Sequence, residues 1–370
     1  MKGSEIVKKN ILFQPYHFNP KLTEGVYAGC REFDLRLAIC QPGMMKTIDL
    51  QSFDGLLSNT LDYTDKIRSH GGKAVCYSMM IGDDKRQHFD AAVACDEQAI
   101  CQLAADYFLH KGYWNFACSL DGMRERAFVE SLHHAGQTEI RIFPKEAFMG
   151  GTLAMRVQFL KDLPKPCAFF VQTVHFGELW YEAIHLAGIR IPDELAVLGI
   201  DDIEYICNLL EPPISSIDTS NFEQGYRMCE VLAKLLNNEP VEPVTLIAPQ
   251  KRVIERASTD CFAVRNEKLR QMIRFACDHF AEGLTVRDLA KQFSLSMPSV
   301  YRLFFNHLWT SPKHFLIELQ LKRAEELMRR GNMKMSAVAK ESGFATLKSF
   351  YAFFKEYHNA TPKEWCCRIR

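Results

Sequence analysis

The sequence predicts two domains of different class: a two-lobed α/β domain over residues 1–260 and an all-α domain with two helix-turn-helix units over residues 266–370. Up to about residue 260, short apolar runs alternate with amphipathic helical segments, a pattern typical of parallel sheets covered by helices. Beyond residue 266 no run has strand character, and helical periodicity occurs twice, about fifty residues apart. The sequence therefore changes fold class near residue 260.

The distribution of charge changes at the same point. Of the 45 Lys and Arg and the 45 Asp and Glu, residues 262–370 hold 19 and 10, which leaves 26 and 35 for residues 1–261. The net charge of zero thus divides into +9 and −9. A basic domain attached to an acidic one indicates two different partners, one of them polyanionic, although basic helices can also be merely solvated faces.

Eight apolar runs in the first domain are short enough to be buried strands. They are Ile11–Phe13, Leu35–Ile39, Phe53–Leu57, Ala74–Tyr77, Asn115–Cys118, Ile140–Phe143, Ala168–Val171 and Leu195–Ile200. Amphipathic segments such as Glu97–Lys111 and Arg124–His134 lie between several of them. The length suits two similar lobes better than one sheet, and ligands of such folds bind beyond the carboxyl ends of the strands.

Polar side chains follow several of these strands. Asp201 and Asp202 come directly after one run, Asp96 follows Val93–Cys95, and Arg124 lies where the chain enters a helix after another. Carboxylates accept hydrogen bonds from pairs of hydroxyls and a guanidinium donates several in a fixed fork. With the nearby aromatic candidates Tyr16, Phe176 and Trp180, this chemistry favours a sugar site. An Asp after a strand can instead be only the N-cap of the next helix.

Several other classes of protein are disfavoured. No nucleophile motif, phosphate-binding loop or dinucleotide-binding glycine pattern occurs, so we expect no catalytic residues, no cofactor and no enzyme. The 13 cysteines form no C-x-x-C pair, and His133–His134 lacks a third ligand at useful spacing, so no metal site is expected. No apolar run reaches membrane-spanning length and the N-terminus lacks a secretory pattern, so we expect a cytoplasmic protein without a membrane partner.

Four stretches of the first domain resemble the LacI/GalR-type sugar-sensing domain over most of residues 8–260: VACDEQAICQLAADYFLHKGYWNFAC, RERAFVESL, AGIRIPDELAVLGIDD and EPPISSIDTSNFEQGYRM. The resemblance implies a periplasmic-binding-protein-like fold, in which two lobes close on a small ligand. It places effector contacts on Arg124, Asp201, Asp96 and Thr173, and on Tyr16 and His17 in the loop after the first strand. Thr173–Val174 stands where that family often has Asn-Asp.

The basic domain shows two helix pairs joined by one long helix. The first pair begins at Thr285, with Asp288 in a variant of the capping box, and turns through Ser294–Ser296. The second begins at Ser336 and turns through Ser342–Gly343, where glycine permits a positive φ. Pro312 opens the connecting helix and Gly331 closes it. Two such pairs in a segment of charge +9 favour double-stranded DNA as the partner over a helical interaction module.

The second helix of each pair is predicted to enter the major groove while surrounding Lys and Arg neutralise phosphates. The outward residues predicted to contact DNA are Met297, Pro298, Ser299 and Arg302 in the first unit and Thr346, Lys348, Ser349 and Tyr351 in the second. Arg302 suits either guanine or phosphate. Each could alternatively be an ordinary solvated helix residue.

Three stretches, SMPSVYRLF, GFATLKSFYAFFK and NATPKEW, resemble the AraC/XylS-type DNA-binding domain over residues 268–368. The signature of its second unit matches Gly343–Phe344, Phe350, Phe354–Lys355 and Thr361–Pro362. Trp309, Ala352 and Asn359 depart from the family pattern. Ala352 replaces a usual arginine, so the second unit is expected to discriminate between sequences less sharply than the first.

The order of the two domains, with RVIERASTD at the junction, resembles regulators of pentose operons. It implies a transcription factor, usually an activator, whose effector is a pentose such as D-xylose. Repeated half-sites in DNA favour a homodimer, and RNA polymerase is a further expected partner. The alternative is a sugar-binding or sugar-processing protein with an accessory helical domain.

Overall fold

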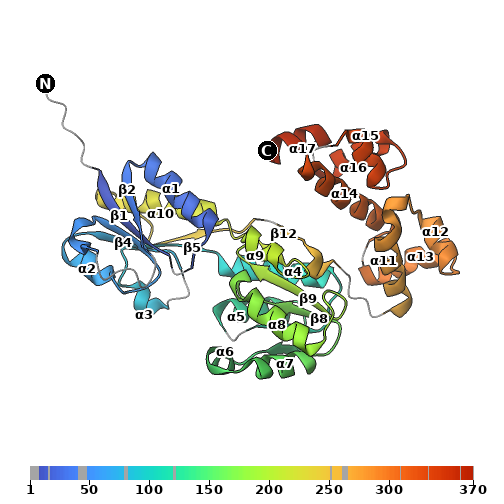
Figure 1. Cartoon of the computed structure of the whole chain (residues 1–370), viewed down its shortest axis with the longest axis horizontal. Helices are drawn as coiled ribbons and strands as arrows, with labels where there is room; N and C mark the ends of the chain where they lie inside the picture. Colours follow the sequence, from blue (N-terminus) through green and yellow to red (C-terminus); the bar gives the residue numbers. More distant parts are fainter. Residues whose placement is uncertain are drawn as a thin grey trace. The chain divides into compact units, whose positions relative to one another are not determined.

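The computed structural model describes residues 8–15, 17–40, 48–78, 82–119, 122–250, 252–260, 266–308, 310–331, 333–358 and 360–369. The backbone contacts divide the chain into two compact units. The first holds residues 1–108 and 114–260, and the second holds residues 109–113 and 261–370 (Figure 1). Each unit is described by itself.

The first unit contains two six-stranded sheets. The order in the first sheet is β11-β5-β4-β3-β1-β2, and all its neighbours are parallel. The order in the second is β12-β10-β9-β8-β6-β7, with only β12 antiparallel to its neighbour. The strands are β1 (Lys9–Gln14), β2 (Leu35–Ile39), β3 (Gly55–Ser58), β4 (Lys73–Cys76), β5 (Ala91–Cys95), β6 (Phe116–Cys118), β7 (Ile140–Ile142), β8 (Cys167–Phe170), β9 (Leu195–Ile200), β10 (Ser215–Ile217), β11 (Val244–Ile247) and β12 (Val253–Ile254).

The α/β prediction is confirmed, and each of the eight predicted runs overlaps a strand. Continuous apolar runs form strands here because helices cover both faces of each sheet. In β1, for example, Ile11 and Phe13 face one apolar core while Leu12 faces the other. The polar strand β10 was not predicted. Its serines are buried and hydrogen-bonded: the Ser215 hydroxyl lies 2.6 Å from that of Thr259, and Ser216 accepts from the Asp202 N–H at 3.1 Å.

The helices of the first unit pack on the two sheets (Figure 1). In the first lobe, α1 and α10 share one core with the sheet and α2 lies on the other face. In the second lobe, α7, α8 and α9 share a core with their sheet. The helices are α1 (Pro20–Glu32), α2 (Thr64–Ser69), α3 (Asp83–Arg86), α4 (Glu97–His110), α5 (Met123–His134), α6 (Lys145–Gly150), α7 (Leu153–Lys161), α8 (Gly177–Ala187), α9 (Glu204–Leu209) and α10 (Asn221–Leu236).

The chain passes between the two sheets three times: after β5, after β10 and after β11. The lobes are therefore joined by three short connections and not by one flexible linker. Because all three connections leave from the carboxyl ends of strands, the loops that follow the parallel strands of both lobes converge at the same place. This arrangement positions the candidate ligand site.

The described residues of the second unit form helices joined by short turns, with no strand among them. Its helices are α11 (Glu267–His279), α12 (Val286–Gln292), α13 (Met297–Leu308), α14 (Pro312–Arg330), α15 (Met335–Glu341), α16 (Leu347–His358) and α17 (Pro362–Ile369). The capping box at Thr285 and Asp288 is present, and the connecting helix α14 begins at Pro312 as predicted. Helix α15 begins one residue before Ser336. Trp309 and Asn359 lie outside the described residues.

Helix α14 belongs to two separate cores. Its first half contributes Phe315, Leu316 and Leu319 to the core of α11–α13. Its second half contributes Leu321, Ala324 and Leu327 to the core of α15–α17. Two helix-turn-helix units on one connecting helix are thus confirmed. Within the part of the chain that the structure describes, no helix is long and apolar enough to cross a membrane.

Candidate functional site

Arg124 is the centre of a charged cluster at the junction of the lobes. It lies in the first turn of α5 and is 8% exposed. Its Nε and Nη2 donate to the two carboxylate oxygens of Glu97 at 2.6 and 3.2 Å, and its Nη1 donates to the Gln172 carbonyl at 2.8 Å. The Asp201 carboxylate lies 3.6 Å from Nη1. Burial opposes the charge of Arg124, but Glu97 and Asp201 raise the pKa of this guanidinium above its ordinary value, so it stays protonated.

Asp201 reaches this cluster because the backbone turns sharply after β9. Its φ is +87°, a left-handed conformation that Asp tolerates better than most residues. Its N–H donates to the Ile217 carbonyl at 3.0 Å, which continues the pairing of β9 with β10 for one more residue. The structure thus brings together Arg124 and Asp201, two of the residues predicted from the sequence.

Two histidines from opposite lobes stack beside this cluster. His17 follows β1 of the first lobe and His175 follows β8 of the second; their ring centroids are 4.9 Å apart. Burial lowers the pKa of both rings although the Asp201 carboxylate opposes it, and His17 lowers that of His175 further. Both imidazoles are therefore neutral at pH 7, and a neutral imidazole offers one donor and one acceptor to hydroxyl groups.

The remaining predicted effector residues have mixed placements. Thr173 is 7% exposed, and its hydroxyl accepts from the His175 N–H at 3.4 Å, which shapes the loop that carries His175. Asp96 caps α4 by accepting from the Ala99 N–H at 3.0 Å, the structural role that the sequence left open. Tyr16 lies outside the described residues.

The aromatic expectation was wrong for Trp180. This ring is fully buried in the core of the second lobe, with edge contacts to Phe143 and Phe169, because it lies on the inner face of α8. It cannot cover a sugar ring. Phe176 is only partly buried and contacts Phe148.

The sequence analysis missed Glu97 and His175. Each lies within two residues of a predicted site residue, Asp96 and Thr173, so the sequence located these strand ends but did not predict the side chains that the structure brings to the cluster. The cluster can accept and donate several hydrogen bonds in a small space, as a polyhydroxy ligand requires. Within the described ranges, no group of His, Cys, Asp or Glu side chains is arranged to hold a metal ion.

In the second unit, Ser296 caps the first predicted recognition helix, α13. The hydroxyls of Ser296 and Ser299 are 2.9 Å apart, and the Ser299 N–H donates to Ser296 at 3.3 Å. Met297, Pro298 and Arg302 are exposed and Ser299 is half-buried. The opposite face carries Val300, Phe304 and Leu308 into the core.

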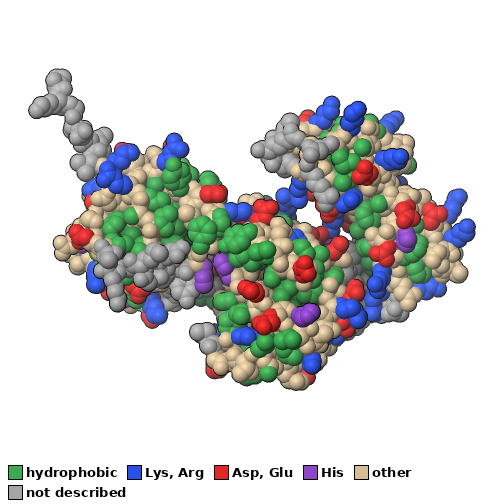
Figure 2. Space-filling view, viewed as in Figure 1, with side chains coloured by type: hydrophobic (Ala, Val, Ile, Leu, Met, Phe, Trp, Pro, Cys, Tyr) green, Lys and Arg blue, Asp and Glu red, His purple; other side chains and the backbone are tan. Residues whose placement is uncertain are grey.

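Thr346 caps the second predicted recognition helix, α16, in the same way. The Ser349 N–H donates to the Thr346 hydroxyl at 3.0 Å, and the two hydroxyls are 3.1 Å apart. Lys348 is exposed, whereas Tyr351 is half-buried and its ring contacts Phe350. Figure 2 shows Lys and Arg side chains spread over the visible face of this helical unit.

The two helix-turn-helix units contact each other directly at Gly343. This residue has a φ of +81°. A Cβ here would overlap the carbonyl oxygen of Phe280, which follows α11 in the first helix-turn-helix unit. Gln320 of α14 donates to the Gly343 carbonyl at 2.9 Å from a buried position. The relative orientation of α13 and α16 is therefore fixed by packing and not only by the connecting helix.

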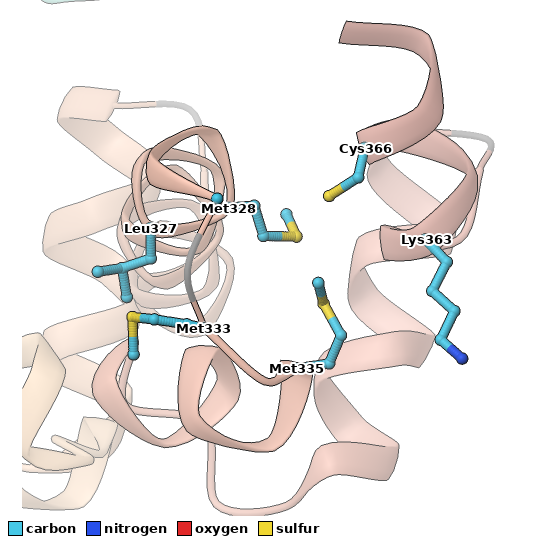
Figure 3. A pocket seen from close by; sticks show the side chains of 7 residues that line it. Leu327, Met328, Met333, Met335, Lys363 and Cys366 are labelled. Carbon is cyan, nitrogen blue, oxygen red and sulfur yellow. The ribbon is translucent and has the colours of Figure 1, made fainter. Parts of the chain in front are cut away.

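A cavity of about 290 Å³ lies in the second helix-turn-helix unit (Figure 3). Its lining comes from α14, α15, α17 and the turn after α14, with none from α16. Met328, Met335 and Cys366 direct their sulfur atoms into it, while Lys363 extends away from it. Paired carboxylates are missing from this lining, so the cavity lacks the chemistry of a sugar site.

Comparison with known protein families agrees with both halves of the structure. Residues 105–259 match the periplasmic binding protein-like domain, and residues 289–367 match a helix-turn-helix domain. The fold and the two domain matches thus indicate a two-domain transcription regulator, in which a periplasmic-binding-protein-like domain precedes an AraC-type helix-turn-helix domain.

The chain is homologous to xylose operon regulatory proteins. It is 24% identical over 345 residues to that of Haemophilus influenzae, with 86% of each chain covered. The chain is also 30% identical over 113 residues to the transcriptional activator RhaS of Salmonella paratyphi B, which covers 30% of this chain and 41% of RhaS. The fold resembles that of a xylose-binding transcription activator, with a TM-score of 0.58, 18% identity and 97% and 98% of the two chains covered.

Proposed function

We propose that the chain is a sugar-responsive transcription regulator that activates genes of pentose catabolism, with D-xylose as the effector. The observation that carries this proposal is the cluster of Arg124, Glu97 and Asp201 beside His17 and His175, at the place where the strand ends of two lobes meet. The names of the curated relatives, xylose operon regulatory proteins, support the choice of sugar.

In the proposed mechanism, the sugar binds between the lobes and favours their closed arrangement. Asp201 accepts hydrogen bonds from neighbouring hydroxyls, Arg124 donates to sugar oxygens, and the neutral histidines bind from both sides. A ligand shifts such an equilibrium only by its difference in affinity for the two states. Contacts made by both lobes at once, as from His17 and His175, exist only in the closed state and supply that difference.

The DNA-binding surface consists of the exposed faces of α13 and α16. Arg302 and Lys348 contribute charge, and the capped N-termini of both helices present backbone N–H groups to phosphates. Because Gly343 and Gln320 fix the two helix-turn-helix units to each other, α13 and α16 bind two adjacent major-groove segments as one rigid body. We propose that a homodimer binds repeated half-sites in the cytoplasm and contacts RNA polymerase there, with domains at residues 1–260 and 266–370.

The proposal is tested by isothermal titration of the full chain against a panel of pentoses and hexoses. D-xylose or another pentose should bind, and Asp201→Asn should weaken its affinity at least tenfold because one anionic acceptor is lost. Asp193→Asn, a change of the same kind at a carboxylate of the surface pair with Arg190, should leave the affinity unchanged. A wild-type chain that binds no pentose contradicts the proposed effector.

A second titration tests the DNA partner. Operator duplex should bind the full chain with an affinity that falls steeply with salt, and Arg302→Ala should weaken it without changing sugar affinity. Sugar binding without any duplex affinity at low salt would instead indicate the alternative, a sugar-binding protein with an accessory helical domain.

A further inference from the structure

Lys21 of the first lobe forms an ion bridge to the second lobe, outside the cluster around Arg124. It lies in the first turn of α1, which packs on the first sheet. Its Nζ donates to Oδ2 of Asp202 at 3.0 Å and to Oδ2 of Asp218 at 2.9 Å. Asp202 follows β9 and Asp218 follows β10, both strands of the second sheet.

The two carboxylates are held in place without Lys21. Oδ1 of Asp202 accepts from Nη2 of Arg256 at 2.9 Å, and its backbone N–H donates to Ser216. Oδ1 of Asp218 accepts from the Ser220 N–H at 2.9 Å. Each carboxylate thus uses one oxygen in its own surroundings and presents the other to Lys21. The acceptors are preorganised, and the ammonium is the mobile partner.

The two adjacent carboxylates of the Gly-Ile-Asp-Asp run, Asp201 and Asp202, have different partners. Asp201 and Asp202 both have positive φ, +87° and +41°, and the backbone turn sends their side chains in different directions. Asp201 faces Arg124, whereas Asp202 is 4% exposed and faces Arg256 and Lys21. A sugar bound at Asp201 and Arg124 therefore leaves the Lys21 bridge intact.

We infer that Lys21 is a positioning residue that stabilises the closed arrangement of the two lobes and so sets the fraction of molecules competent to bind sugar. The inference rests on the proposed function. When the lobes separate, α1 moves with its own sheet and the ammonium must leave at least one carboxylate. Asp202 keeps Arg256, and the Lys21 side chain is 38% exposed, so water replaces the lost bonds at small cost. The contact is therefore reversible, as a conformational equilibrium requires.

The same short segment carries a second contact between the lobes. His17 and Lys21 lie four residues apart and contact three separate loops of the second sheet, those after β8, β9 and β10. Apparent affinity equals intrinsic affinity multiplied by the competent fraction, so loss of a closing contact weakens sugar binding without any change in the sugar's own contacts.

The test uses isothermal titration of the full chain with D-xylose. Lys21→Met should weaken apparent affinity by about three- to tenfold, the range expected for a partly exposed ion bridge. Lys21→Arg should restore most of it. Lys66→Met removes a charge from the exposed surface of α2 in the same lobe and should have no effect. An affinity of Lys21→Met equal to wild type overturns the inference.

Asp218→Asn tests the same ion bridge by changing one of the two carboxylates that bind Lys21. It should weaken apparent affinity less than Lys21→Met, because Asp202 still accepts from the ammonium. The double variant should be no weaker than Lys21→Met alone, since the partner of Asp218 is already absent. Fully additive effects would show that Lys21 and Asp218 act separately and would contradict the bridge.

A zero-length carbodiimide cross-link between Lys21 and Asp202 or Asp218, detected by mass spectrometry, separates the two proposals. We expect the cross-link to form in the wild-type chain and its yield to rise with D-xylose. A missing cross-link, or a yield that sugar binding leaves unchanged, overturns the bridge. Failure of the wild-type chain to bind any pentose contradicts the proposed function, and the cross-link still tests whether Lys21 joins the lobes.

Discussion

The sensor unit and the helical unit position their functional side chains in opposite ways. The charged cluster of the sensor draws Glu97, Arg124 and Asp201 from three elements that are far apart in the sequence. The recognition helices of the helical unit are fixed by caps within four residues, Ser296 with Ser299 and Thr346 with Ser349. Beside this cluster, the stack of His17 from one lobe on His175 from the other must change when the lobes move, whereas a locally capped helix keeps its shape and moves as a rigid body.

The largest expected effect is at the centre of the long-range cluster. Arg124→Met should lower the free energy of unfolding by about 3–5 kcal/mol, because Glu97 and Asp201 are left without their cation. Thermal and urea unfolding measure the loss, and Arg141→Met, at an exposed arginine of β7 in the same lobe, is the matched control. Adding Glu97→Gln should recover part of the stability. No recovery in the double variant would show that the ion pair is unimportant.

The next effect tests the contact that joins the two helix-turn-helix units. Gly343→Ala should cost about 2 kcal/mol or more, since a left-handed backbone and an overlap with the Phe280 carbonyl add together. It should also weaken binding to a duplex with both groove sites more than to one with a single site. Gly283→Ala has the same φ, +81°, but its Cβ would meet only the Gly343 carbonyl oxygen, at an ordinary contact distance of 4.0 Å, and should cost only about 1 kcal/mol. Equal losses of stability in Gly343→Ala and Gly283→Ala would contradict the overlap with the Phe280 carbonyl.

A smaller effect is expected at the caps. Ser296→Ala and Thr346→Ala should each lower stability by about 1 kcal/mol and weaken DNA binding while leaving sugar affinity unchanged. Because the two caps share no partner, their effects should add in the double variant, unlike those of Arg124 and Glu97. Chemical denaturation of the wild-type chain and of these three variants checks this contrast. Strong coupling between the caps would remove the distinction between the two units.

The smallest expected effect is a pH dependence of the free energy of unfolding, caused by the stacked histidines His17 and His175. Burial lowers the pKa of His17 and His175 in the folded chain below the ordinary 6.5, so the unfolded chain binds more protons just below that pH. Stability should therefore rise with pH through this window and fall as the pH drops below 6.5. Urea titrations between pH 5 and pH 7 should show a shallower slope for His175→Asn than for wild type. An unchanged slope would show that His175 does not contribute.

Much of the fold could be predicted because buried parallel strands and amphipathic helices leave clear patterns, as in Leu195–Ile200 and α14. Strand β10 was not predicted because its serine hydroxyls form hydrogen bonds with other buried groups, and a search for apolar runs cannot detect such a strand. Of the candidate site, Arg124 and Asp201 were predicted from their positions after strands and from the family resemblance, and the structure brings them together. Glu97 and His175 were missed, and Trp180 was misassigned, because the direction of a side chain at a strand end or on a helix depends on packing from distant segments.

The single unbroken helix α14 also constrains how the operator could change. Its 19 residues span about 28 Å at about 1.5 Å each, and each added residue would rotate the following unit by about 100° about the helix axis. Inserting one alanine near the middle of α14 would therefore swing α16 away from the face of the duplex that α13 occupies. The length of α14 therefore cannot be adjusted finely. A change of groove spacing requires the two helix-turn-helix units to repack at the ends of α14 while its length stays the same.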